Sequence, residues 1–189
     1  MAVTFANITV GAGTLYVGSN AAGAATYDVG ATQDGVAITW EPDMVDIEVD
    51  QFGDAARVIL SKVKVMVKTT LAENSLTNLA LAWSYAGAYG AGDSYVTGPL
   101  PGQISATEIN MGISSVNPTE RKIVTVGTAP SANVNVAKTR TYTCNRAISV
   151  ASSELKYTRT ENVKIPVEFR ILPLSTQTGK EYGTIVDQA

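Results

Sequence analysis

The sequence of 189 residues contains no histidine and a single cysteine, Cys144. The lack of histidine excludes every catalytic triad that uses imidazole, and it removes the ligand on which most zinc sites depend. A single cysteine cannot form an intramolecular disulfide, so we expect packing alone to hold the fold together. A chain of this length can bury roughly 70% of the surface that it exposes when unfolded, which is enough for a stable domain without disulfides.

Long apolar runs and an excess of basic residues are also missing. No run of 18 apolar residues occurs, so we expect no transmembrane helix. The chain begins Met-Ala-Val-Thr-Phe-Ala-Asn, without the basic and apolar regions of a signal peptide, and we expect none. The 14 Lys and Arg residues against 17 Asp and Glu give a net charge of −3. Because no basic tail or stripe is present, the sequence predicts no tight or sequence-specific nucleic-acid binding.

One acidic segment resembles the start of a calcium-binding loop, since Asp46, Glu48 and Asp50 alternate along it. Such a loop needs Gly at its sixth position and Glu at its twelfth, and here Gln51 and Arg57 occupy those positions. We therefore expect no metal site and no cofactor. No other set of residues supports an enzyme.

In two segments, residues 45–50 and residues 62–68, apolar and charged residues alternate with a period of two. This period of two is typical of a half-buried strand, because successive side chains leave opposite faces of it. One segment presents acids and the other presents lysines, so antiparallel pairing would place opposite charges across from each other. We predict a hairpin whose long connecting loop, residues 51–61, carries apolar residues. The charged face of this predicted hairpin consists of Asp46, Glu48, Asp50, Lys62, Lys64 and Lys68.

The rest of the chain predicts more short strands, which favours one antiparallel β-sandwich or partial barrel spanning residues 1–189. Residues 163–171 alternate regularly, and Pro166 within them indicates an edge or a bulge because proline cannot donate to a strand ladder. From Ser175 we expect a flexible tail that stays loose until a partner orders it. The other predicted strands cover residues 14–18, 36–40, 121–126, 134–149 and 155–160, and residues 18–25 are predicted to form a loop.

One flanking helix is predicted at about residues 71–84. Its apolar residues recur at the spacing of a single helix face, which we expect to pack on the sheet. Thr70 with Glu73 matches a capping box, and Asn74 or Ser75 is an alternative cap. The predicted core face of the helix consists of Leu76, Leu79, Ala80 and Trp83.

The order of these features resembles one protein family. A strand ending in Trp40-Glu41-Pro42-Asp43 leads into the acidic segment at residues 46–51, and a loop and a strand then precede residues 70–80. Near the end, residues 163–172 are followed by residues 179–187. Together these segments are similar to the major tail tube protein of long-tailed, siphovirus-like bacteriophages. The similarity is weakest between about residues 87 and 117.

The resemblance implies a β-sandwich-like structural subunit with a flanking helix. In such a family, subunits form hexameric rings in which neighbouring sheets join into a continuous barrel, and the rings stack into a tube. DNA passes through the tube during ejection without specific binding. The implied partners are other copies of the chain and the tape-measure, tail-terminator and tail-tip proteins, with no membrane. The implied location is the tail of a virion that is assembled in the host cytoplasm.

The resemblance also implies roles for two sets of residues. The charged face of the hairpin is expected to line the lumen of the tube. The long loop is expected to bridge to the next ring, with Phe52, Arg57, Val58, Ile59 and Leu60 in the contact.

A second interpretation belongs to a different class of protein. Aromatic residues could serve a monomeric β-sandwich module that binds carbohydrate or another surface. Such a module would stay monomeric and would need no long apolar loop. Its candidate residues are Trp40, Trp83, Tyr85, Tyr89 and Tyr95.

Overall fold

The computed structural model describes residues 11–18, 24–48, 55–83, 120–130, 138–151, 154–157, 159 and 162–188. Within this part of the chain the fold is mainly β, with a single short helix, and every strand pairing is antiparallel, which confirms the predicted fold class. The strands are β1 (Thr14–Gly18), β2 (Ala25–Asp28), β3 (Thr32–Glu48), β4 (Ala55–Leu71), β5 (Arg121–Ala129), β6 (Lys138–Ser149), β7 (Ile165–Ile171) and β8 (Thr184–Asp187), and the helix is α1 (Leu76–Ala82).

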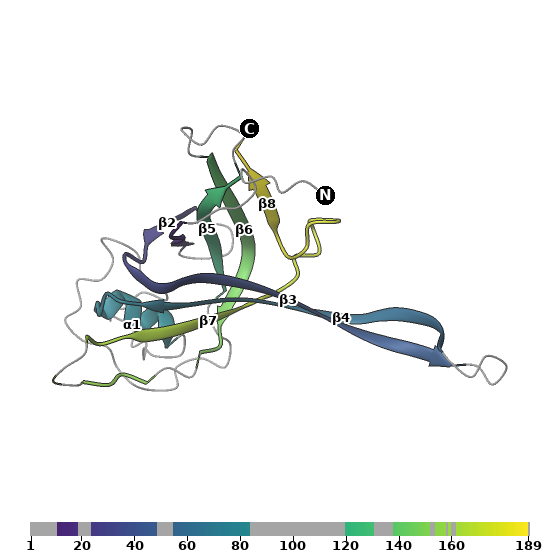
Figure 1. The fold of residues 1–189 in the computed structure, drawn as a ribbon, viewed down its shortest axis with the longest axis horizontal. Helices are drawn as coiled ribbons and strands as arrows, with labels where there is room; N and C mark the ends of the chain where they lie inside the picture. Colours follow the sequence, from purple (N-terminus) through teal and green to yellow (C-terminus); the bar gives the residue numbers. More distant parts are fainter. Residues whose placement is uncertain are drawn as a thin grey trace, which may run out of the picture.

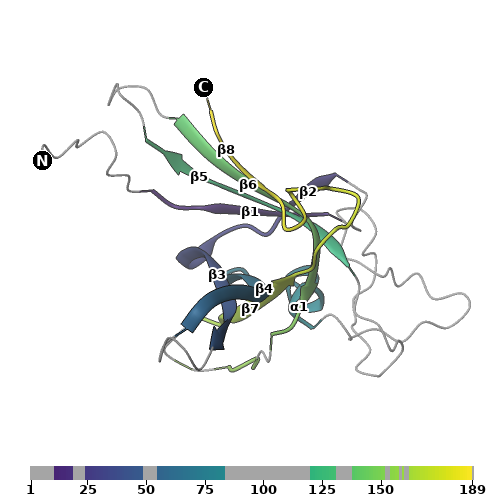
Figure 2. The same ribbon diagram turned by 90° about the vertical axis from the view of Figure 1, so that its right-hand side faces the viewer.

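The strands form one sheet that folds over into two layers. Its order is β2-β1-β5-β6-β7-β4-β3, and β8 pairs with β6 beside this path. β1, β5, β6 and β8 make one layer, while β3, β4 and β7 make the other (Figures 1 and 2). The two layers are joined where β6 pairs with β7, from Ala147 opposite Ile171 to Ser149 opposite Phe169. The result is sandwich-like and open, because β3 does not pair with β2 or β8 in the described residues.

The core lies between these layers and is built from the alternation of their strands. In β7 the odd-numbered residues are all buried, as the period of two predicts, and Phe169 is fully buried. On one side Pro166 pairs with Thr70 of β4. On the other side of β7 the pairing with β6 extends only from Ile171 to Phe169, so this proline lies at an edge as predicted. The largest fully buried apolar side chains of the core are Leu15, Leu71, Leu81, Ile123, Ile165 and Phe169.

β3 and β4 are far longer than the sequence predicted. The segment expected at residues 36–40 and the described part of the segment expected at 45–50 lie on one strand of 17 residues, and β4 also has 17 residues. Asp34 and Gly35 form a bulge within β3, where both residues have positive φ and the pairing skips from Gln33 to Val36. Most of the predicted loop at residues 51–61 is strand as well, because β4 already begins at Ala55.

The helix is shorter than predicted, and its cap is the alternative one. Ser75 is the N-cap, and its hydroxyl accepts a hydrogen bond from the Asn78 backbone N–H at 3.1 Å. The Thr70–Glu73 capping box does not form, because Thr70 lies in β4 and the Glu73 carboxylate accepts from the Ala31 backbone N–H at 2.8 Å. Glu73 thus ties the chain before the helix to the start of β3.

The C-terminal segment differs from the predicted loose tail. Residues 175–182 form turns, and β8 then pairs with β6 from Thr184 opposite Thr143 to Asp187 opposite Arg140. The side chains of Arg140 and Asp187 add two hydrogen bonds of 2.6 and 2.8 Å. Of the strand predicted at residues 155–160, the described residues 155–157 and 159 are not strand.

Candidate assembly surface

The β3–β4 hairpin projects from the body of the molecule as a long arm (Figure 1). β4 pairs with β7 only as far as Val65, opposite Ile171. Among the described residues, β4 beyond this point pairs with β3 alone. We therefore define the arm as residues 41–48 of β3 and 55–64 of β4. An isolated two-stranded hairpin is only marginally stable in water, so an arm of this kind is expected to gain stability from a partner.

The outer half of the arm exposes large apolar side chains, and each of them is at least 39% exposed. They lie on both strands of the arm. These residues are Met44, Val45, Ile47, Val58, Ile59 and Leu60. Summed over both faces of the arm they present roughly 500 Å² of apolar surface, which equals the largest apolar patch of a typical monomer, a feature that is often functional. Of the predicted contact residues, Arg57, Val58, Ile59 and Leu60 lie here on β4, whereas Phe52 lies outside the described residues.

The predicted pairing of acids with lysines is wrong. Asp46 lies opposite Val58, and Glu48 lies opposite Ala55. Lys62 lies opposite Asp43 and forms an ion pair with it at 2.9 Å. The register therefore differs from the predicted one, because the strands extend past the assumed loop and the pairing begins closer to the tip.

A second consequence of this register is that the predicted charged face divides between two faces of the hairpin. Lys62, Lys64 and Lys68 share one face of the hairpin, and the residues opposite them on β3 all have odd numbers. Asp46 and Glu48 have even numbers on β3, so their side chains leave the opposite face. Asp50 lies outside the described residues.

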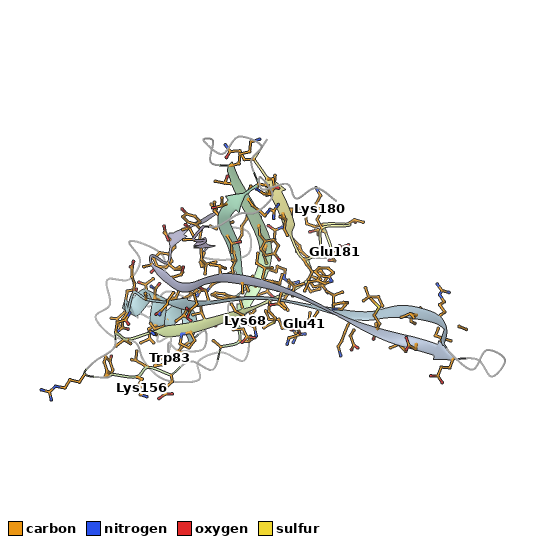
Figure 3. The ribbon with its side chains drawn as sticks, viewed as in Figure 1. Glu41, Lys68, Trp83, Lys156, Lys180 and Glu181 are labelled. Atoms are coloured by element: carbon orange, nitrogen blue, oxygen red, sulfur yellow. The ribbon has the colours of Figure 1, made fainter. Side chains whose placement is uncertain are left out.

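The lysines belong instead to a stripe of ion pairs that runs from the arm onto the body. Lys64 pairs with Glu41 at 3.5 Å, and Lys68 pairs with Glu168 of β7 at 3.0 Å. Figure 3 shows Glu41 at the root of the arm and Lys68 on the body beside it. These groups are about half exposed, so each pair contributes at most about 1 kcal/mol of stability. The charges nonetheless neutralise one another locally. The predicted hairpin did not place Glu41 and Asp43 opposite the lysines, although both lie a few residues before the acidic segment.

The C-terminal segment holds the root of the arm. The Tyr182 ring meets the Trp40 ring edge-on, with 5.8 Å between centroids and 79° between planes. The Tyr182 hydroxyl donates to the Val63 carbonyl at 3.4 Å, and the Tyr142 hydroxyl donates to the Tyr182 carbonyl at 2.7 Å. Burial raises the pKa of Tyr142, so its hydroxyl remains a donor at all ordinary pH values. The contacts of Tyr182 with Trp40 and Val63 could not be predicted, because they join residues more than a hundred positions apart in sequence.

The ion pair that fixes β8 is electrostatically favourable. The hydrogen bonds from Arg140 lower the pKa of Asp187, and the same bonds raise the pKa of Arg140. Because β8 leads directly from Tyr182, this pair keeps the segment that contacts the arm in place.

The predicted helix face is only partly buried. Leu79 and Ala80 are buried, and Trp83 is partly buried against the core. Leu76 is exposed in the single chain, whereas Asn78 and Leu81 are fully buried. The helix is thus rotated relative to the predicted face, since Asn78 bonds to the Val29 carbonyl at 2.9 Å and turns inward.

Of the aromatic residues of the alternative interpretation, the two that the structure describes, Trp40 and Trp83, do not share one platform. Trp40 lies at the root of the arm against Tyr182, and Trp83 lies at the end of α1 against the core. Figure 3 shows Trp83 well apart from Glu41, the neighbour of Trp40 in sequence. Tyr85, Tyr89 and Tyr95 lie outside the described residues.

Two other features are absent from the described residues. These residues contain no group of three or more Cys, Asp or Glu side chains placed to hold a metal ion. No helix among them is long and apolar enough to cross a membrane. No protein-family model matches the sequence, and a search of curated proteins found no match. The geometry of the arm is therefore the principal guide to function.

Proposed function

We propose that this protein is a structural subunit of a siphovirus-like bacteriophage tail tube, which forms hexameric rings that stack around a lumen for DNA. The observation that carries the proposal is the arm, which places six large apolar side chains in solvent at the end of two 17-residue strands. Its function is then mechanical and not catalytic. The resemblance in sequence order, described above, supplies the kind of assembly.

The energetics of the arm favour contact with another copy. At about 25 cal/mol per Å², burying roughly 500 Å² contributes on the order of 12 kcal/mol per arm before the entropic costs of association are subtracted. The arm points away from the body, so its outer half cannot bury this surface within its own subunit (Figure 1). A partner that is present in many copies, such as the same chain in a neighbouring ring, meets this requirement for every subunit.

The open sheet favours ring formation for a separate reason. β3 and β8 each have an edge without a strand partner among the described residues, and β3 is long. Such edges promote uncontrolled pairing unless they are covered, and closing a sheet into a barrel removes them. Pairing between neighbouring subunits would give both edges partners and would form the continuous barrel of a ring.

The stripe of ion pairs suits a surface that DNA passes without binding. Its lysines are matched by Glu41, Asp43 and Glu168, so no dominant basic patch results. Retention of DNA depends on the number of phosphate contacts that unneutralised Lys and Arg can make. We place this stripe, in revision of the predicted lumen set, on the lumen side of the proposed ring.

The test is assembly of the purified protein, observed by negative-stain electron microscopy and light scattering at rising concentration. We expect hollow tubes or hexameric rings for the wild type. Val58→Asp should leave the monomer folded, because Val58 is 53% exposed there, but should block growth of tubes by placing a carboxylate in an apolar contact.

Asn74→Asp is the matched control, since it adds the same charge at an exposed position outside the arm. Tubes of Val58→Asp that grow like the wild type would refute the role of the arm. A wild type that stays monomeric at every concentration would contradict self-assembly and favour the monomeric binding module, which a glycan screen with a Trp40→Ala variant would then examine.

A further inference from the structure

The two faces of the arm differ in chemistry near its root. One face, which we call the core-side face, continues the buried side of β4, and Trp40 and Val65 lie opposite each other on it. The other face, which we call the charged face, carries the pairs Glu41–Lys64 and Asp43–Lys62. A strand pair with one apolar and one charged face is the ordinary pattern for a surface that is covered on one side only.

Beyond Asp43 this difference disappears. The pairing passes from Asp43 opposite Lys62 to Met44 opposite Leu60, so Ser61 is an extra residue in β4. A bulge of this kind shifts the alternation of its strand by one position. Lys62 and Leu60 therefore lie on opposite faces of the arm although both have even numbers.

Past the bulge, apolar residues occupy both faces of the arm. We call residues 44–48 and 56–60 the tip. Met44, Leu60 and Val58 continue the core-side face, where Asp46 joins them. Val45, Ile59 and Ile47 continue the charged face, where Arg57 joins them. Among the described residues, the cross-strand ion pairs of the arm end at the bulge, which therefore marks the boundary between a root with paired charges and a tip rich in apolar side chains.

We propose that the tip is inserted between two other copies of this chain, with one copy covering each face. This inference rests on the proposed function and specifies how the arm is received. Each face offers roughly 250 Å² of exposed apolar side chain, which is well below the ~800 Å² per partner of a standard interface. Coverage of a single face would leave three large apolar side chains in water, whereas insertion between two copies buries all six.

A second copy is the occupant that the surface favours. The tip carries acids and a base in near balance, Asp46 and Glu48 with Arg57, so it has no charge bias toward a strongly acidic or basic partner. Two neighbours in one ring provide two surfaces side by side for each arm from the next ring. The number of receiving gaps then equals the number of arms, which a contact with a protein present in one copy cannot provide.

The experiment compares adjacent residues that leave opposite faces of one strand. Val58→Asp alters the core-side face of the tip, and Ile59→Asp alters its charged-face side. We expect each variant to reduce tube yield by at least tenfold while the circular dichroism spectrum of the monomer stays unchanged. Asn74→Asp, which adds the same charge at an exposed position outside the arm, is the control that should assemble normally. Normal tubes from Ile59→Asp, with Val58→Asp blocked, would overturn the two-sided contact and leave the proposed function intact.

Photo-cross-linking gives an independent measurement that requires no assembly defect. A benzoyl-phenylalanine is placed at position 58 or at position 59, and the cross-linked peptides from assembled tubes are identified by mass spectrometry. We expect cross-links to another copy from both positions, to different peptides of the receiving subunits. Cross-links from one position alone would overturn the inference. Absence of rings and tubes from the wild type would overturn both the inference and the proposed function.

Discussion

The buried amide of Asn78 provides a quantitative test of how the helix is fixed to the sheet. Asn78 is fully buried, and its side chain makes three hydrogen bonds. Its carbonyl oxygen accepts from the Tyr27 hydroxyl at 2.8 Å, and its amide nitrogen donates to the carbonyls of Val29 and Glu73, both at 2.9 Å. These partners come from β2, from the residue that follows β2, and from the segment before α1. One side chain therefore joins the helix to the N-terminal strands.

Asn78→Ala removes all three hydrogen bonds, and the three partner groups lose their hydrogen bonds to this side chain. At about 1 kcal/mol for each bond, and with a small cavity in addition, the free energy of unfolding should fall by about 3–4 kcal/mol. A domain of this kind has a total stability of about 5–15 kcal/mol, so the loss is a large fraction of it. Leu76→Ala is the control, because Leu76 is exposed on the same helix and should change stability by less than about 1 kcal/mol.

Urea unfolding followed by circular dichroism, under conditions in which the protein is monomeric, measures both variants. Asn78→Asp adds a pH test. Its carboxylate would face the carbonyls of Val29 and Glu73, so the pKa of that carboxyl should lie above its unfolded value. The folded state then binds the proton more tightly, and the stability of this variant should rise as pH falls from 7 toward 4. A loss below about 1 kcal/mol for Asn78→Ala, or a pH dependence of the opposite sign, would refute the role of this amide.

Two further predictions concern β6 and the strand that pairs with it. Burial raises the pKa of the Cys144 thiol to about 12. A thiol reagent should therefore label the native protein slowly even at pH 9 and label the unfolded protein rapidly in urea. Fast labelling of the native protein would contradict the packing of β6. Gly183 has a φ of 113°, and a Cβ there would clash with the Thr143 carbonyl oxygen, so Gly183→Ala should detach β8. Limited proteolysis would reveal this detachment as early cleavage in residues 175–187. Gly179→Ala is the control, because Gly179 also has a positive φ but an added Cβ there would meet no other atom.

The fold class could be predicted from the sequence because alternation is a local property. The odd-numbered residues of β7 alternate without interruption, and the structure buries them as the period predicts. β1 likewise occupies residues 14–18, as predicted. In each case the signal lies within the strand itself and needs no knowledge of its partner.

The register of the arm could not be predicted for a physical reason. Opposite charges suggested that Asp46 and Glu48 face the lysines, but Glu41 and Asp43 offer the same charges at a different offset. The choice between them depends on bulges at Ser61 and near the tip, which leave no distinct mark in the sequence. A shift of one residue reverses the faces, so an error in register becomes an error in the predicted lumen face.

The helix start and the tail were missed because distant groups determine them. Glu73 is a good capping residue locally, but its carboxylate is used by the Ala31 backbone N–H. The segment after Ser175 has few apolar residues, and it is held by Arg140 and Tyr142 of a strand far away in sequence. Local propensity is a weak guide wherever such tertiary bonds compete with it.

The geometry of the arm also bears on why assembly should continue past a closed ring. The tip and the surfaces that would receive it are different parts of the same chain, so their contact is heterologous. A heterologous contact that does not close on itself generates an open-ended polymer, whereas contacts that close by rotation generate rings. In the proposed tube, edge pairing of β3 with a neighbour would close by rotation, whereas insertion of the tip into the next ring would not. One chain with both kinds of contact therefore has the two operations that a stacked tube requires. Each ring would leave its arms free on one side for the next ring.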